Sequence, residues 1–74
     1  MFCVVSYETA AFEVIMAVRK GEPARAIHHL MRQARYFEQE VTAVRVVGKG
    51  LTYEEAHALL ATASPSDGVK VEMP

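Results

Sequence analysis

Between Gly21 and Phe37 the chain reads GEPARAIHHLMRQARYF, which places two adjacent histidines among three arginines and a tyrosine. Guanidinium groups bind phosphate through paired hydrogen bonds, and imidazole and phenol groups add further ones. Metal binding is less favoured, because adjacent side chains on a helix diverge by about 100° and do not meet at one ion. Among the kinds of chemistry considered, phosphate binding is the one that these residue types are able to perform.

The spacing of these residues gains meaning if they lie on a helix. Pro23 suits a first helical turn, and a helix over 23–39 would have an apolar side made of Ala24, Ile27, Leu30, Met31, Ala34 and Phe37. The polar side would carry one stripe with the spacing i, i+4, i+7, i+11, here called the basic stripe: Arg25, His29, Arg32 and Tyr36. His28 and Arg35 would lie about a quarter-turn away. This set is the candidate partner- or phosphate-binding site, and an ordinary solvated helix face is the alternative.

Strand-like segments surround this helix. Residues 2–8 are rich in β-branched and aromatic types and predict a strand. Residues 12–19 alternate as a strand would but also fit a helix that Gly21 ends; we favour the strand, joined by a turn over 8–11. Residues 41–48 predict a third strand, which a tight connection at 48–50 would follow.

The clearest local signal begins the second helix. Thr52 followed by Glu55 forms a capping-box pattern, which predicts a helix over 53–63. A loop over 64–68 and a last, edge strand over 69–73 would follow. The prediction is one domain, 1–74, of the α+β class, with element order β-β-α-β-α-β. It would have a small mixed or antiparallel sheet with both helices on one face.

Such an arrangement would leave the other face of the sheet uncovered and apolar. We expect Val5, Tyr7, Ile15 and Val47 to lie on it, as a surface for a homodimer or for another protein. The alternative is that one helix wraps further round the sheet.

Composition limits the remaining function classes. The net charge of -1 favours no partner class, although bases gather over 19–35 and acids over 50–74. Cys3 is the single cysteine and the histidines lack zinc-finger spacing, so we expect no disulfide, metal or cofactor and a cytoplasmic location. No apolar run is long enough to span a membrane, and the first residues lack the pattern of a secretion signal.

The element order, with the runs VIMAVRKGEPARAIHHLMRQARYF, VTAVRVV and GLTYEEAHALL, resembles a degenerate GIY-YIG nuclease domain. In that family a hairpin with two tyrosine motifs precedes a helix that carries an arginine and often a histidine four residues later. Arg25 and His29 match this spacing. CVVSY and IMAVRKG depart from the tyrosine motifs, and Leu60 stands near the place of the metal-binding glutamate. The resemblance therefore implies a nucleic-acid-binding fold relative in which metal-assisted cleavage is not expected.

We expect a non-enzymatic protein-interaction module that uses the basic stripe or the apolar face. By analogy with other very small α/β proteins, it would be an inhibitor of a host system encoded by a phage or mobile element, as anti-CRISPR proteins are. It would act by surface blocking or mimicry. The alternative is a nucleic-acid-binding, GIY-YIG-like domain that uses the basic stripe, with residual nuclease activity as the enzymatic version.

Overall fold

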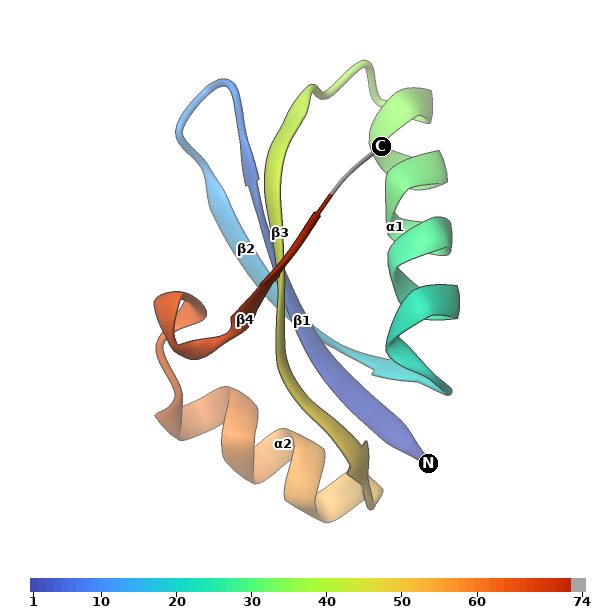
Figure 1. Ribbon diagram of the computed structural model, residues 1–74, viewed down its shortest axis with the longest axis vertical. Helices are drawn as coiled ribbons and strands as arrows, with labels where there is room; N and C mark the ends of the chain where they lie inside the picture. Colours follow the sequence, from blue (N-terminus) through green and yellow to red (C-terminus); the bar gives the residue numbers. More distant parts are fainter. Residues whose placement is uncertain (73–74) are drawn as a thin grey trace.

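A computed structural model describes residues 1–72 and contains one four-stranded antiparallel sheet. Its strands lie in the order β2-β1-β3-β4 (Figure 1). Their bounds are β1 Phe2–Thr9, β2 Val14–Lys20, β3 Val41–Leu51 and β4 Val69–Val71. The preference for a strand over 12–19 is confirmed, because β2 pairs with β1 along its whole length. Met73, the end of the predicted last strand, lies outside the described residues.

The described residues also contain two helices and one short 3-10 turn: α1 Pro23–Tyr36, α2 Tyr53–Thr62 and η1 Pro65–Asp67. The α+β class and the predicted element order are confirmed, with an antiparallel sheet. The capping box is present, since the Thr52 hydroxyl accepts from the Glu55 N–H at 3.2 Å and the Glu55 carboxylate accepts from the Thr52 N–H at 3.0 Å. This reciprocal pair satisfies two backbone donors that a helix N-terminus leaves free.

The prediction that both helices share one face of the sheet is wrong. Four consecutive residues of β1, from Cys3 to Ser6, are buried, so both faces of this central strand are covered. Cys3 and Val5 pack against Ala26 and Leu30 of α1. The opposite face is covered by α2 and η1.

Three contacts identify the α2 face. The Phe2 ring packs edge-to-face on Tyr53 at 5.4 Å, and the Ser6 hydroxyl donates to the Pro65 carbonyl at 3.2 Å. Gly48 pairs with Val4, and a Cβ added at Gly48 would lie 2.5 Å from the Leu59 Cδ2 atom, so glycine leaves room for α2 here. Because side chains alternate along β1, its even-numbered residues need a second cover, which α2 provides.

The predicted break after Gly48 is also wrong, because β3 continues to Leu51. Between the pairs Val5–Val46 and Val4–Gly48, β3 contains one residue more than β1, and this residue is Val47. Such an irregularity is typical of a β-bulge, which bends a strand without ending it. The bend lets the end of β3 lead into α2 on the other face of the sheet.

The apolar side of α1 is rotated relative to the expectation. Its fully buried residues are Ala26, Leu30 and Ala34, whereas Ala24 is exposed and Phe37 is 66% exposed. The helix also ends at Tyr36, before the predicted end at residue 39. This rotation points the Ala26 side of the helix at β1 and brings the neighbouring His29 toward β2.

Candidate functional site

The residues of the basic stripe all lie on the exposed side of α1. Arg25, His29 and Arg32 are exposed, and Tyr36 is 82% exposed. His28 and Arg35 are exposed as well. The helix therefore keeps this whole set in contact with solvent, available for a ligand.

A shallow open hollow of about 440 Å³ lies between the end of β2 and the first half of α1. Its lining residues, here called the basic cleft, are Arg19, Lys20, Gly21, Arg25, Ala26 and His29. The structure thus brings Arg25 and His29 together with two cations from another element. Arg32 and Tyr36 continue the stripe along α1 beyond the cleft.

Local sequence brings the two walls of the cleft together. Only Gly21 and Glu22 separate β2 from α1, so the start of the helix must lie beside the end of the strand. Gly21 has φ +95, a conformation that side chains other than glycine rarely adopt, and its N–H donates to the Met1 carbonyl at 2.8 Å. Pro23 then begins the helix. The small Ala26 leaves the space between the walls open.

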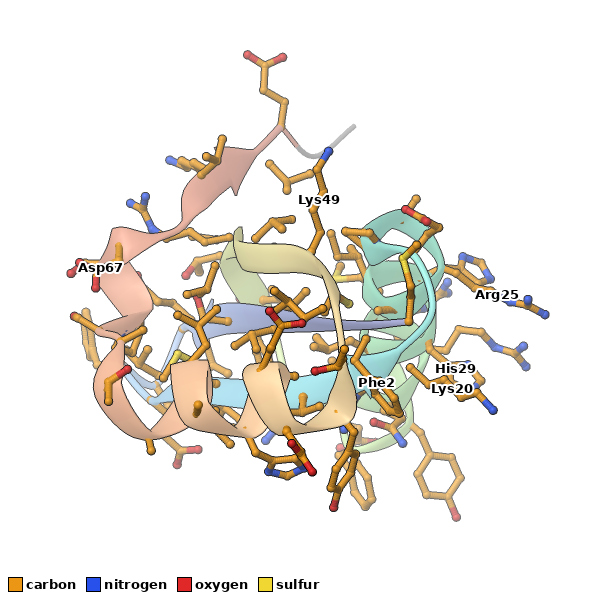
Figure 2. The ribbon with its side chains drawn as sticks, turned by 90° about the horizontal axis from the view of Figure 1, so that it is seen from below. Phe2, Lys20, Arg25, His29, Lys49 and Asp67 are labelled. Carbon is orange, nitrogen blue, oxygen red and sulfur yellow. The ribbon has the colours of Figure 1, made fainter. Side chains whose placement is uncertain are left out.

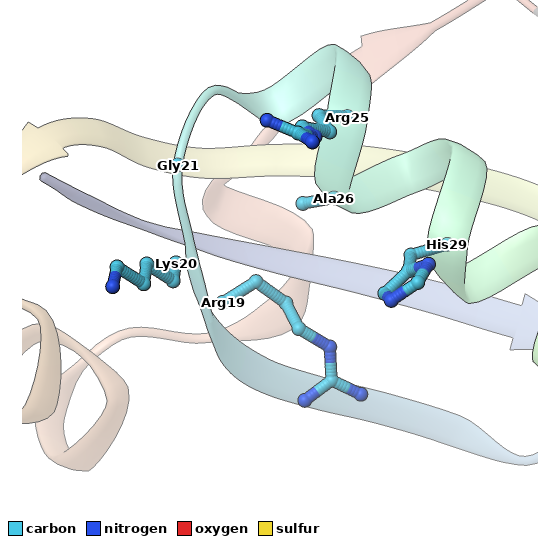
Figure 3. A pocket seen from close by; sticks show the side chains of 6 residues that line it. All are labelled: Arg19, Lys20, Gly21, Arg25, Ala26 and His29. Atoms are coloured by element: carbon cyan, nitrogen blue, oxygen red, sulfur yellow. The ribbon is translucent and has the colours of Figure 1, made fainter.

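The cations of the cleft differ in direction. Figure 3 shows the Arg19 side chain extending over β2 on the side of His29, whereas Lys20 points the other way and Arg25 lies higher, at the first turn of α1. Alternation along β2 explains the difference: Arg19 pairs with Cys3 on the α1 face and Lys20 with Phe2 on the α2 face. Arg19 also donates from Nη1 to the Val18 carbonyl at 3.4 Å. Arg19 therefore extends on the same side of the sheet as α1, which carries the other two basic lining residues, Arg25 and His29.

Cys3 lies beneath this region and is fully buried. Burial raises the pKa of its thiol, and the nearby Glu22 carboxylate raises it further, while Arg19 acts in the opposite direction. A raised pKa keeps the sulfur protonated and poorly nucleophilic at neutral pH. Cys3 is thus part of the core.

The opposite end of the molecule has the opposite charge. Glu13, Glu38 and Glu40 line a hollow where the β1–β2 hairpin meets the end of α1, and the Ala10 N–H donates to the Glu40 carbonyl at 2.9 Å. Figure 2 shows Arg25, His29 and Lys20 on one side of the molecule and Asp67 on the other, where Arg45 donates from Nη1 to the Gly68 carbonyl at 3.2 Å. The acidic hollow and the basic cleft therefore lie at opposite ends of β2, and the cleft is lined by three of the eight lysine and arginine residues, Arg19, Lys20 and Arg25.

The expected docking face of the sheet is covered. Val5 is 0% exposed beneath α1, and Tyr7, Ile15 and Val47 are half-buried. A homodimer through this face is therefore not supported. This prediction failed because it placed both helices on the opposite face of the sheet, whereas α1 packs on the face that contains Val5.

Sequence reasoning did not include Arg19 and Lys20 in the site. They belong to the run of bases over 19–35, and the two-residue link before Pro23 was the signal that could have joined them to Arg25.

Leu60 lies half-buried on α2, across the sheet from the cleft. Within residues 1–72, no group of three or more histidine, cysteine or acidic residues could hold a metal ion.

None of the helices in residues 1–72 has the length and apolar character needed to cross a membrane. Comparison with known proteins finds no matching family, no similar curated protein and no similar solved structure.

Proposed function

We propose that this domain binds the phosphate groups of nucleic acid in the basic cleft, without cleaving them. The observation that carries the proposal is that Arg19, Arg25 and His29, which come from two separate elements, line one open hollow. Guanidinium groups suit phosphate because they donate paired hydrogen bonds and keep their charge at all physiological pH values. A cleft that is open to solvent also admits a long polymer.

The basic stripe extends the proposed contact. From Arg25 to Tyr36 the helix rises about 16 Å, at 1.5 Å per residue. Arg32 lies between them on the same side of α1, so cations continue away from the cleft along the helix. A ligand with several phosphates could contact both the cleft and the stripe.

The resemblance to GIY-YIG domains agrees with this proposal. Arg25 and His29, the two residues that match the family's helix, both line the cleft. The departures at the tyrosine motifs and at Leu60 favour binding without cleavage, since metal-assisted hydrolysis needs a ligand set for its ion.

Fluorescence anisotropy with labelled oligonucleotides at several salt concentrations tests the proposal. We expect affinity to fall with salt, because bound cations release counterions from the phosphates. Arg19→Ala and Arg25→Ala should each weaken binding roughly tenfold, as a hydrogen bond to a charged group contributes about 1.5 kcal/mol. Each should lower the salt slope by about 1. Lys70→Ala removes an exposed cation on β4 and is the matched control. Absence of binding at low salt, or equal loss in the control, would contradict the proposal.

A second candidate function is protein interaction through the outer edge of β2. β2 is an outer strand of the sheet, and its first five residues, Val14–Val18, are all uncharged. An uncharged stretch of five residues on an outer strand is suited to pairing with another strand. An inhibitor encoded by a phage or mobile element could block a host protein in this way.

Sedimentation over a range of protein concentrations tests the version in which the second strand comes from another copy. Val14→Lys should abolish association through β2, because it places a charge at the exposed start of this edge. Val69→Lys places the same charge on β4, the opposite edge, and should leave association unchanged. A wild-type chain that stays monomeric at all concentrations excludes pairing between copies.

A further inference from the structure

We infer that the nucleic acid bound by this domain is single-stranded, with an unpaired base stacked on Tyr36. The inference rests on the proposed function and adds that the bound nucleic acid is single-stranded. It is carried by the position of an exposed aromatic pair at the end of the basic stripe and by the change of charge immediately after it.

Tyr36 offers a ring with little else to contact. It is 82% exposed, and its neighbour Phe37 is 66% exposed. The two rings pack edge-to-face, with centroids 5.2 Å apart and planes at 88°. An edge-to-face partner steadies a ring. With most of its surface in solvent, Tyr36 remains accessible to a base.

Charge along α1 indicates which part of the ligand reaches Tyr36. Cations lie toward the N-terminal side of Tyr36, at Arg25 and Arg32. Glu38 and Glu40 follow it, and they line the acidic hollow with Glu13. Phosphates are favoured along the arginines and disfavoured beyond Tyr36, because like charges repel. A neutral base therefore suits the position of Tyr36 better than a phosphate does.

This order, with phosphates along the arginines and a base at Tyr36, indicates a single-stranded nucleic acid and not a duplex. In a duplex the faces of the bases are already stacked on one another, so a side chain cannot stack on them without unpairing. In a single strand the bases can turn away from the phosphates and stack on an aromatic ring. A row of cations that ends at an exposed ring is the arrangement by which single-strand-binding surfaces combine backbone and base contacts.

The test compares an unpaired octanucleotide of DNA, its RNA counterpart and a blunt hairpin duplex, by anisotropy at low salt. We expect both single strands to bind more tightly than the duplex. Tyr36→Ala should weaken single-strand binding about tenfold, the lower part of the range for one base–aromatic stack. Tyr36→Phe should restore binding, because it keeps the ring. Tyr53→Ala, an exposed tyrosine on α2, should leave binding unchanged.

Tyrosine emission gives a second readout, since the chain has three tyrosines and no tryptophan. Binding of the unlabelled single strand should quench emission in the wild type and much less in Tyr36→Ala. Tighter duplex binding, or an unchanged affinity in Tyr36→Ala, would overturn the inference while Arg19→Ala and Arg25→Ala still support phosphate binding. Absence of binding to every oligonucleotide would overturn both.

Discussion

The two helices of this domain are stabilised in different ways. α1 has no side-chain cap at its N-terminus, and its stability comes from burial of Ala26, Leu30 and Ala34 against the sheet. α2 buries only Ala56 completely but begins with a complete capping box. Tertiary packing therefore determines how α1 is rotated, and local hydrogen bonds determine where α2 begins. The basic cleft is formed in part by α1. The position of the candidate site therefore depends on how α1 packs against the sheet, and not on hydrogen bonds within the helix.

The largest expected effect is on the packing of α1. Leu30 is 2% exposed and belongs to the core with Cys3, Val5 and Ala26. Leu30→Ala should lower the free energy of unfolding by about 3 kcal/mol, from lost burial and the cavity that remains. Leu59→Ala, at a half-buried position of α2, should cost less. Urea denaturation followed by circular dichroism measures both, and equal losses would contradict the comparison.

A smaller effect is expected at the start of α2. Thr52→Ala removes the hydroxyl that accepts from the Glu55 N–H and should cost about 1 kcal/mol of unfolding free energy. Thr62→Ala is a matched control, because its hydroxyl donates to the Ala58 carbonyl within the same helix and caps no free N–H. If the two substitutions cost the same in thermal unfolding, the capping box is not what stabilises α2.

A stabilising change is expected at the end of α1. Glu38 has φ +57, and its N–H donates to the Arg35 carbonyl at 3.1 Å while the Gln39 N–H donates to the Ala34 carbonyl at 2.8 Å. This pair of bonds is the Schellman ending, whose left-handed position usually holds glycine. Glu38→Gly should raise the free energy of unfolding by about 0.5–1 kcal/mol by relieving the strain. A lower melting temperature would show that the Glu38 side chain contributes more than its strain costs.

The smallest effect concerns pH. Hydrogen bonding with Thr52 holds the pKa of the Glu55 carboxyl below its ordinary value; the backbone N–H of Thr52 has the larger effect and its hydroxyl the smaller one. Because the folded pKa is the lower one, this contribution is complete above the ordinary glutamate pKa and is lost as pH falls through the folded pKa. Melting curves from about pH 6 to about pH 3 should therefore fall less steeply for Glu55→Gln than for the wild type. Identical slopes would contradict this reasoning.

Several features were predictable because they depend on neighbouring residues. The capping box located the start of α2, and Pro23 located the start of α1. Alternation and composition favoured the strand that became β2. The position of the basic stripe on the outside of α1 also followed from helical periodicity, since its members lie opposite the apolar side.

Other features were not predictable, because they depend on which surfaces meet. β1 is apolar on both faces, and nothing in its own sequence assigns a helix to each face. α1 is rotated by part of a turn relative to the prediction. It therefore buries Ala26 in place of the expected Ala24 and leaves Phe37 exposed. Arg19 joined the site only because β2 ends beside α1.

The sequence by itself determined the main helices and strands, their order and the capping box at the start of α2, since these depend on hydrogen bonds and periodicity within a few residues. Only the tertiary structure decided that the helices cover opposite faces, that the apolar face around Val5 is closed, and that Arg19 lines the same hollow as Arg25 and His29. The physical reason is that burial is shared between segments far apart in the chain. An apolar strand specifies that it must be covered, but the covering element depends on the geometry of the whole sheet.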